Sequence, residues 1–341
     1  MKLGYGLITC QRPPDDPRSD ADLYQQAVEL AVEAERLGFD SVWLTEHHFV
    51  DDGYMPSLMA VAAAVAVRTE RILIGTGLVL APLHDPIRLA EDAATVDLLS
   101  RGRLVLGLGL GWREQEFEGL QIPMDQRLSR TVDAVTIMRQ AWGDGLVTGG
   151  RKRPRPAVSV TPKPYRPGGP PIWIGAVAEP AVRRAARIGD GYMSGDIAAD
   201  GFAEQIGWLH DELPNRRRPG APEPSIYQAT FAVTEGDAWE QVRPHRHYLN
   251  WKYDDMDQPG GASRTGPATT PPPLAADDEQ ALREITVAGT PDQVAAGIAR
   301  YRDAAGDDLH YIAQLYWPGM EYQRQREAMR VFAEQVAPKL R

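Results

Sequence analysis

Strand-like and helix-like segments alternate almost from one end of this 341-residue chain to the other. Short apolar runs predict strands, and longer segments with apolar residues three and four apart predict helices. Eight such strands separated by helices indicate a parallel sheet with helices packed on it. We expect strands at Leu3–Ile8, Val42–Thr45, Ile72–Leu80, Leu104–Leu108, Ile172–Ala176, Gly191–Ser194, Tyr227–Val233 and Leu309–Leu315, and helices at Asp20–Leu37, Ser57–Val67, Pro86–Leu99, Gln126–Trp142, Pro180–Ile188, Pro291–Ala305 and Tyr322–Val336.

These eight units fit one closed barrel. A barrel of eight strand–helix units needs about 250 residues and tolerates insertions, so the whole chain can form one domain. We therefore predict an α/β fold with a single parallel (β/α)8 barrel over residues 1–341. An open, doubly wound sheet is the alternative, but no glycine-rich nucleotide-binding turn follows the first strand.

One polar segment, Asp254–Glu279, interrupts the alternation after the seventh strand. It contains Gly260-Gly261 and three consecutive prolines, Pro271–Pro273. Loops of this length in compact domains are usually lids, binding loops or disordered segments. A barrel would place this one beside its C-terminal mouth. We interpret 254–279 as a mobile lid, with an inert insertion as the alternative.

Composition narrows the classes of partner. The net charge of −10 argues against a nucleic acid or an anionic membrane surface as a partner. No apolar run approaches the roughly 18 residues that a membrane-spanning helix needs. The first residues enter a strand without the features of a signal peptide, and the single cysteine, Cys10, excludes an intramolecular disulfide bond. We expect a cytoplasmic protein.

Three titratable residues, Glu46, His47 and His48, directly follow the second strand. In a (β/α)8 barrel the C-terminal ends of the strands carry the chemistry. Imidazole changes protonation near neutral pH, so a histidine there suits proton transfer. The alternative is that one histidine caps the strand and the other faces solvent.

The same residues, with His84 and Asp85 after the third strand, raise the question of a metal ion. Adjacent residues on a strand point to opposite faces, so His47 and His48 cannot both easily reach one ion. We therefore favour acid–base chemistry and assign no metal ligand. Two ligands from one strand end with a third from another remain an open arrangement.

Two glycine-containing segments follow later strands. Gly107-Leu108-Gly109-Leu110-Gly111 lacks the spacing of a dinucleotide-binding fingerprint, but its glycines would let a flat ligand approach the backbone. The turn Gly175–Glu179 precedes a helix, and free N–H groups at a helix start suit a phosphate. Each segment has a structural alternative, because glycine also relieves crowding where barrel strands bend.

Taken together, these stretches resemble the bacterial luciferase-like family of flavin-dependent monooxygenases. The resemblance covers nearly the whole chain, and its most specific part combines GFDSVWLTEHHF with Asp97-x-Leu99-Ser100-x-Gly102-Arg103. Further similar segments are MKLGYGLIT, RILIGTGLVLAPLHDPIRLAEDAATVDLLSRGRLVLGLGLGW, PPIWIGAVAEPAVRRAARIGDGYM and VAGTPDQVAAGIARYRDAAG.

The resemblance implies a single parallel barrel that binds reduced FMN, or in a sister branch the deazaflavin F420, at its C-terminal mouth. The monooxygenases react the reduced flavin with dioxygen to form a flavin hydroperoxide, which oxygenates a small organic substrate. His47 matches the family's catalytic histidine, and Glu46 or a neighbour would set its orientation. The Glu-His-His segment favours FMN, since the F420 branch tends to carry Asp-His there.

The resemblance also assigns residues to cofactor binding. The turn Ala176, Val177, Ala178 and Glu179 matches the flavin phosphate region. Ala178 lacks a hydroxyl that luciferases have, so backbone N–H groups and Ser194 would serve instead. Gly77 lies where the third strand would kink beneath the flavin ring. Gly109, in the loop after the fourth strand, is also assigned to cofactor binding.

Two departures separate this chain from the light-emitting luciferases. Gly109 and Leu110 stand where those enzymes carry a reactive cysteine and an arginine, which argues against aldehyde bioluminescence. Asp85 stands in place of a second histidine, with His84 one residue earlier.

The resemblance finally suggests partners and alternatives. No motif for a nicotinamide coenzyme stands out, so a separate flavin reductase would supply reduced FMN in a transient encounter. Helix Ser57–Val67 is rich in small residues, which suits burial on two sides and a homodimer. An FMN-dependent monooxygenase is the main hypothesis. An F420-dependent hydride-transfer enzyme and a flavin-binding protein without turnover are the alternatives.

Overall fold

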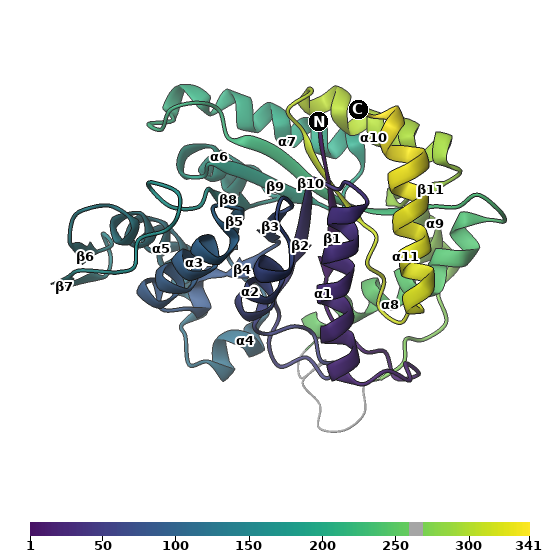
Figure 1. Cartoon of the computed structure of the whole chain (residues 1–341), viewed down its shortest axis with the longest axis horizontal. Helices are drawn as coiled ribbons and strands as arrows, with labels where there is room; N and C mark the ends of the chain where they lie inside the picture. The colour runs from purple at the N-terminus through teal and green to yellow at the C-terminus, as the bar shows by residue number, and fades with distance from the viewer. Residues whose placement is uncertain (259–268) are drawn as a thin grey trace.

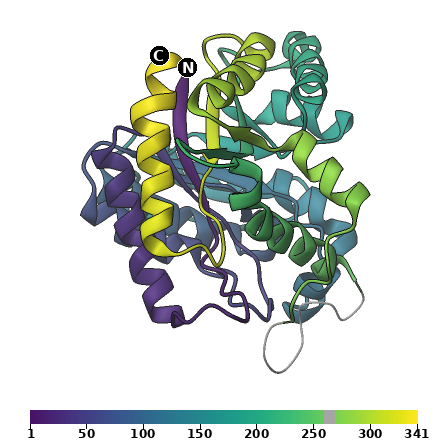
Figure 2. The same cartoon turned by 90° about the vertical axis from the view of Figure 1, so that its right-hand side faces the viewer.

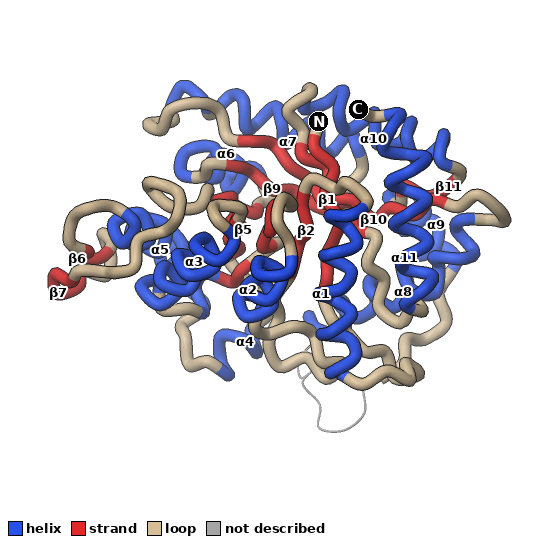
Figure 3. The backbone as a smooth tube through the Cα atoms, viewed as in Figure 1, coloured by secondary structure: helices blue, strands red, loops and turns tan. Residues whose placement is uncertain are grey.

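The protein folds as a closed parallel barrel, seen in a computed structural model that describes residues 1–258 and 269–341. Strand β1 pairs with β2 on one side and with β12 on the other, and β9 pairs with β10 to close the ring. Figure 3 shows the strands at the centre and the helices around them. The predicted (β/α)8 barrel is confirmed. In order around the ring the strands are β1 (Lys2–Ile8), β2 (Ser41–Leu44), β3 (Leu73–Thr76), β5 (Leu104–Gly109), β8 (Ile172–Gly175), β9 (Gly191–Gly195), β10 (Glu223–Ala232) and β12 (His310–Gln314).

A layer of helices covers the outside of the barrel (Figure 1). The first and last long helices, α1 and α11, lie side by side, and the hydroxyl of Tyr322 donates to Glu29 at 2.8 Å between them (Figure 2). Both termini lie at the end of the barrel where β1 begins. The helices are α1 (Asp20–Arg36), α2 (Leu58–Arg68), α3 (Pro86–Ser100), α4 (Glu114–Gly119), α5 (Arg127–Trp142), α6 (Glu179–Ile188), α7 (Ala199–Asp211), α8 (Ala238–Asp257), α9 (Ala276–Ile285), α10 (Pro291–Ala305) and α11 (Tyr322–Val331).

The inside of the barrel is filled by large side chains, so it is a packed core. The rings of Trp43 and Trp173 lie 5.1 Å apart between centroids. Burying a large apolar side chain contributes about 1.5–3 kcal/mol. A Cβ on Gly75 would come within 2.3 Å of the Trp43 ring, so glycine is needed there to make room. The interior cluster consists of Leu7, Trp43, Val105, Trp173, Met193 and Ile312.

The third predicted strand, Ile72–Leu80, forms two pieces, β3 and β4 (Val79–Leu80). The strand is interrupted at Gly77-Leu78, whose peptide bond is cis. The Leu78 side chain packs against the cluster inside the barrel. A Cβ on Gly175 would lie 2.1 Å from Leu78, and one on Gly107 would lie 2.1 Å from the carbonyl oxygen of Thr76. These glycines accommodate the break in the strand.

The Asp97–Arg103 motif stabilises the fold. The Arg103 guanidinium donates to the carbonyl oxygens of Ala66, Thr69 and Ile72, and so holds the end of α2. Gly102 has a φ of +84°, a conformation that favours glycine. The motif therefore shapes the turn between α3 and β5.

Several features were not anticipated from the sequence. A short hairpin of β6 (Val147–Gly149) and β7 (Pro154–Val158) projects from one side of the barrel (Figure 1), and β11 (Val287–Gly289) adds to β10. Helices α4, α7, α8 and α9 were all missed. The predicted lid segment, 254–279, begins inside α8 and ends inside α9, and its residues 259–268 lie outside the described part of the chain.

Among the helices of the described residues, none combines the length and the apolar character that crossing a membrane requires.

Candidate active site

His47 lies at the C-terminal mouth of the barrel, as predicted, just beyond the end of β2. Its side chain is almost fully buried, and its backbone N–H donates to the carbonyl oxygen of Met55 at 3.1 Å. The N–H of Met55 in turn donates to the carbonyl oxygen of Thr9, just past β1. The loop after β2 therefore folds back over the mouth and fixes the backbone of His47.

The carboxylate that orients His47 is Glu116, from helix α4. Its Oε1 lies 2.8 Å from Nδ1 of His47 and accepts a hydrogen bond from the backbone N–H of His48 at 2.9 Å. A carboxylate on Nδ1 favours the tautomer with its proton there, which leaves Nε2 free to accept a proton. Glu116 is fully buried, and within residues 1–258 and 269–341 its Oε2 has no hydrogen-bond partner.

Three aromatic rings surround His47 edge-on. The ring centroids of Tyr54, Tyr253 and Trp112 lie 4.8, 5.6 and 5.9 Å from that of His47. The hydroxyls of Tyr54 and Tyr253 are 2.9 Å apart, and burial raises the pKa of both groups. Both tyrosines are therefore neutral at physiological pH, and the imidazole is held in a largely apolar cage.

Glu46 does not contact His47. Its Oε1 lies 2.9 Å from Nε2 of His48 and 2.8 Å from Nε2 of His84, and its Oε2 accepts from the N–H of Leu80 at 2.8 Å. Burial acts to raise the pKa of Glu46, but the hydrogen bonds from the two histidines outweigh it and lower the pKa to about 2. The orienting role proposed for Glu46 or a neighbour falls to Glu116, while Glu46 joins His48 and His84 into a separate cluster.

Asp85, which the resemblance identifies as a departure from the family pattern, caps helix α3. Its carboxylate accepts from the N–H groups of Ile87 and Arg88 and pairs with Arg155 at 2.6 Å. It is a structural residue, whereas the neighbouring His84 reaches the cluster around Glu46.

Helix α8 closes over the mouth and is anchored by buried charges. The ammonium of Lys252 is fully buried and lies 2.6 Å from Asp51 and 3.3 Å from Asp255. One turn earlier, the hydroxyl of Tyr248 donates to Asp52 at 2.9 Å. Asp51 and Asp52 belong to the loop after β2, so these contacts fix α8 to the segment that carries His47.

A cavity of about 160 Å³ lies between α8 and the strand ends. Arg246 and Asp196 form an ion pair of 2.7 Å in its wall, and Oδ1 of Asp196 is buried without a hydrogen-bond partner among the described residues. Such an atom can accept a hydrogen bond from a ligand. The cavity is lined by Leu7, Thr9, Tyr54, Asp196, Tyr227, Arg246, Leu249, Asn250, Tyr253 and Gln314.

The predicted phosphate turn lies at the start of α6. Val177, Ala178 and Glu179 are exposed, and no side chain caps this helix start. The Glu179 carboxylate pairs with Arg183 at 2.8 Å and does not cap the helix. The backbone N–H groups of the turn therefore have no side-chain acceptor. A helix start of this kind attracts an anion.

Ser194 is buried and does not face this turn directly. Its hydroxyl and that of Tyr192 both donate to Oε1 of Gln205, whose Nε2 donates to the carbonyl oxygen of Val177 at 3.1 Å. Ser194 therefore supports the turn through Gln205. Gln205 itself was missed, because a polar residue in a helix resembles ordinary surface.

The two glycines assigned to the cofactor lie beside the break in the third strand. A Cβ on Gly77 would lie 3.0 Å from Leu7, and one on Gly109 would lie 3.2 Å from Leu78. Protein side chains thus occupy the space next to both, and their contact with a cofactor stays a prediction.

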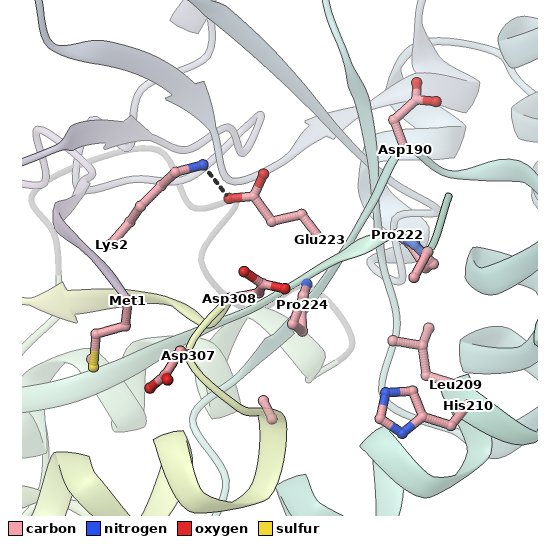
Figure 4. Close-up of a pocket in the computed structure, with 12 residues that line it drawn as sticks. Met1, Lys2, Asp190, Leu209, His210, Pro222, Glu223, Pro224, Asp307 and Asp308 are labelled. Carbon is pink, nitrogen blue, oxygen red and sulfur yellow. Dashed lines mark hydrogen bonds and ion pairs between the residues drawn. The ribbon is translucent and has the colours of Figure 1, made fainter. Parts of the chain in front are cut away.

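A second hollow, of about 530 Å³, lies at the opposite end of the barrel, where β1 and β10 begin. Figure 4 shows the ion pair between Lys2 and Glu223 across it, at 2.7 Å. Asp190, Asp307 and Asp308 add carboxylates to its wall. The strand N-termini form this end, which supports stability more often than chemistry in such barrels.

Comparison with known proteins supports the family resemblance. The sequence model of the luciferase-like monooxygenase family matches residues 1–308. The flavin-dependent trigonelline monooxygenase, oxygenase component, of Acinetobacter baylyi is 32% identical over 179 residues, 51% of this chain and 49% of that protein. The chain thus matches about half the length of this relative.

Two further proteins match along their whole length. The F420-dependent glucose-6-phosphate dehydrogenase of Amycolatopsis mediterranei is 28% identical over 359 residues, which cover 100% of this chain and 99% of that protein. The crystal structure of monooxygenase RslO1 from Streptomyces bottropensis superposes with a TM-score of 0.85 at 26% identity, covering 99% of both chains. Relatives therefore include both monooxygenases and F420-dependent dehydrogenases.

Proposed function

The chain belongs to the luciferase-like monooxygenase family, and on that premise we propose that it is an FMN-dependent monooxygenase that oxygenates a small organic substrate with dioxygen. The observation that carries this proposal is the buried His47–Glu116 pair at the barrel mouth, 2.8 Å between Nδ1 and Oε1. A histidine that is held in one tautomer inside an aromatic cage suits controlled proton transfer.

The residues present fit a phosphorylated flavin. The exposed, uncapped start of α6 offers N–H groups of Val177–Glu179 to a phosphate. The cavity beneath α8 contains Oδ1 of Asp196, which is buried and has no hydrogen-bond partner among residues 1–258 and 269–341. When bound, reduced FMN would supply the two electrons that the reduction of dioxygen requires.

The chain's own residues prepare the site for that chemistry. Glu116 accepts a hydrogen bond from the Nδ1–H of His47, so Nε2 can take up or deliver a proton. Tyr54 and Tyr253, which join through their hydroxyls, wall the imidazole off from water. Helix α8 holds Tyr253 in place because Lys252 ties it to the loop after β2.

An F420-dependent oxidoreductase is the second candidate. The glucose-6-phosphate dehydrogenase relative aligns over the entire chain, whereas the trigonelline monooxygenase aligns over half of it. Both coenzymes carry a phosphate, so the α6 turn suits either. In that case His47 would handle a proton while hydride moves between coenzyme and substrate.

One experiment separates these candidates. The purified protein is titrated under anaerobic conditions with reduced FMN and with reduced F420, and each complex is then mixed with air-saturated buffer in a stopped-flow spectrometer. We expect tight binding of reduced FMN and a protein-stabilised oxygenated flavin species. Binding of F420 alone without a reaction with oxygen would contradict the monooxygenase and favour hydride transfer. Binding of FMN with no change in its oxidation by air would favour a flavin-binding protein without turnover.

We also propose that a separate flavin reductase supplies the reduced FMN in a transient encounter.

We propose in addition that two copies of the chain associate through α2. The α2 side chain of Val67 is 62% exposed, and a groove of about 690 Å³ runs between α1 and α2. Its wall includes Val28, Val61 and Ala64, an apolar surface of the kind that partners cover. We expect light scattering to show a dimer for the wild type and a monomer for Val67→Glu. If the variant has the same mass in solution as the wild type, this interface is excluded.

A further inference from the structure

The ends of two barrel strands bring three potential metal ligands together beside His47. These are Oε1 of Glu46, Nε2 of His48 and Nε2 of His84, and all three atoms lie within 4.8 Å of one another. We propose that they form a binding site for a divalent transition-metal ion of the zinc class. Two imidazoles and one carboxylate are an established ligand set for zinc, with further positions left to water.

The present distances are close to those that an ion requires. Oε1 of Glu46 lies 2.9 Å from the His48 nitrogen and 2.8 Å from the His84 nitrogen. Zinc binds such atoms at about 2.0–2.2 Å, so a tetrahedral site spaces its ligands roughly 3.3 Å apart. The two histidine nitrogens lie within 4.8 Å of each other, so the two imidazoles would have to rotate to admit the ion. Neutral rings would then carry their proton on Nδ1, and an imidazolium would release one proton.

Glu46 and His48 converge on one cluster while His47 does not. Glu46 and His48 are two positions apart, just beyond the end of β2, and their side chains lie 2.9 Å from each other. His47 points the other way, to Glu116. Adjacent histidines cannot both easily reach one ion, and this arrangement needs only one of the two.

The cluster has a rigid side and an accessible side. Oε2 of Glu46 is held by the N–H of Leu80 at 2.8 Å, which orients the carboxylate as an outer-shell contact does in metal sites. A groove of about 380 Å³ between α2 and α3 is lined by Glu46 and His84. It gives an ion a path from solvent and leaves space for water ligands. Asp92, on α3, adds negative charge to the same groove.

A bound ion would join the end of β2 to the turn after β4. Glu46 and His48 extend from β2, and His84 follows the short turn Ala81–Leu83. Without an ion, hydrogen bonds hold the same atoms together, and direct bonds to an ion would hold them more firmly. The ion would therefore stiffen the segment next to His47. This inference does not depend on which coenzyme the protein uses.

The test is a metal titration of the full-length protein after treatment with a chelator. Co²⁺ serves as the spectroscopic probe, and Zn²⁺ is then added in competition. We expect one Co²⁺ per chain, visible absorption bands of tetrahedral or five-coordinate cobalt, and their loss when Zn²⁺ displaces it. The melting temperature should rise with Zn²⁺, because an ion that binds only the folded state stabilises it.

Variants assign the ligands. His84→Gln and His48→Gln keep a hydrogen-bond donor for Glu46 but remove the ligand nitrogen. Each should weaken Zn²⁺ binding by about 100-fold or more, since even outer-shell changes cost about 10–100-fold. The control is His210→Gln, which replaces an exposed histidine on α7 at the opposite end of the barrel. This variant should bind Zn²⁺ as tightly as the wild type does.

Two results would overturn the proposal. One is wild-type protein that takes up no stoichiometric Co²⁺ or Zn²⁺ at a micromolar concentration. The other is a set of variants in which His210→Gln loses binding while His84→Gln retains it. The wild-type cobalt spectrum decides the first point even if a variant fails to fold.

Discussion

Oε1 of Glu116 lies 2.8 Å from Nδ1 of His47, although 69 positions separate the two residues in the chain. The same oxygen also accepts the backbone N–H of His48, so the carboxylate fixes both the ring and the strand end that carries it. The tautomer of His47 therefore depends on helix α4, an element that is only six residues long.

Replacing Glu116 should impair the proposed chemistry more than cofactor binding. In Glu116→Gln the amide oxygen can still accept both hydrogen bonds, but it has no negative charge to stabilise a proton that Nε2 of His47 takes up. We expect the single-turnover oxygenation rate to fall by about 10²-fold, the lower end of the range for acid–base catalysis, with flavin affinity within about threefold. Glu118→Gln, on the exposed face of the same helix, is the control. Equal rates in both variants would remove Glu116 from the positioning role.

Replacing His47 tests the proton-transfer role itself. His47→Ala should leave flavin binding largely intact and slow oxygenation by about 10²–10⁴-fold. Stopped-flow mixing of the reduced complex with oxygen and substrate measures this rate, and His210→Ala is the matched surface control. Unchanged turnover in His47→Ala would show that this histidine takes no part in the reaction.

Removing the buried ammonium of Lys252 should destabilise the fold. Lys252→Met leaves Asp51 and Asp255 without their shared cation, and breaking a buried pair in this way costs about 3–5 kcal/mol. Lys339→Met breaks an exposed pair with Asp292 and should cost at most about 1 kcal/mol. Urea unfolding measures both, and a similar small loss in the two variants would contradict a structural role for Lys252.

The carboxylate of Glu46 should contribute to acid stability. Its pKa in the folded protein is about 2, below its ordinary value of 4.5, so its contribution is complete above pH 4.5 and is lost as the pH falls towards 2. The difference in unfolding free energy between wild type and Glu46→Gln should therefore shrink over that window. The same comparison in a His84→Gln background should give a smaller change, because glutamine can donate to the carboxylate but cannot carry the positive charge by which His84 also lowers its pKa. A pH-independent difference would be inconsistent with this assignment.

Gly107 should resist substitution for reasons of packing. A Cβ there would lie 2.1 Å from the carbonyl oxygen of Thr76, a backbone atom that cannot move aside easily. Gly107→Ala should lower the unfolding free energy by about 1–3 kcal/mol, the usual cost of overpacking. Gly145→Ala, where no atom lies within 4 Å of the added Cβ, is the control. Thermal unfolding distinguishes them, and equal melting temperatures would disprove the packing explanation.

The barrel could be predicted because its signal is local. Each strand is a short apolar run, and helices such as α1 show their spacing within 17 residues. Helix α8 was missed since it contains Pro244 and many charged residues, and its burial comes from partners far away in the chain. The fully buried Lys252 resembles a surface lysine until its contact with Asp51 is known.

The site was predicted in part for the same reason. The strand end carrying His47 has a sequence signature, whereas its partner Glu116 occurs in the polar run EQEFEG, which gives no sign of burial. Glu46 was paired with His47 because they are neighbours, although Glu46 contacts His48 and His84 while His47 contacts Glu116. The contacts of Ser194 with Gln205 likewise depend on how α7 packs, which no local pattern records.

The anchoring of α8 has a consequence for engineering. This helix supplies Arg246, Leu249, Asn250 and Tyr253 to the wall of the cavity, so it is the natural element to exchange with a relative when a new substrate is wanted. Its Lys252 and Tyr248, however, are matched to Asp51 and Asp52 in the loop after β2. A chimera that imports the helix alone would bring mismatched charges into a dry interface. The helix and that loop behave as one exchangeable module and should be transplanted together.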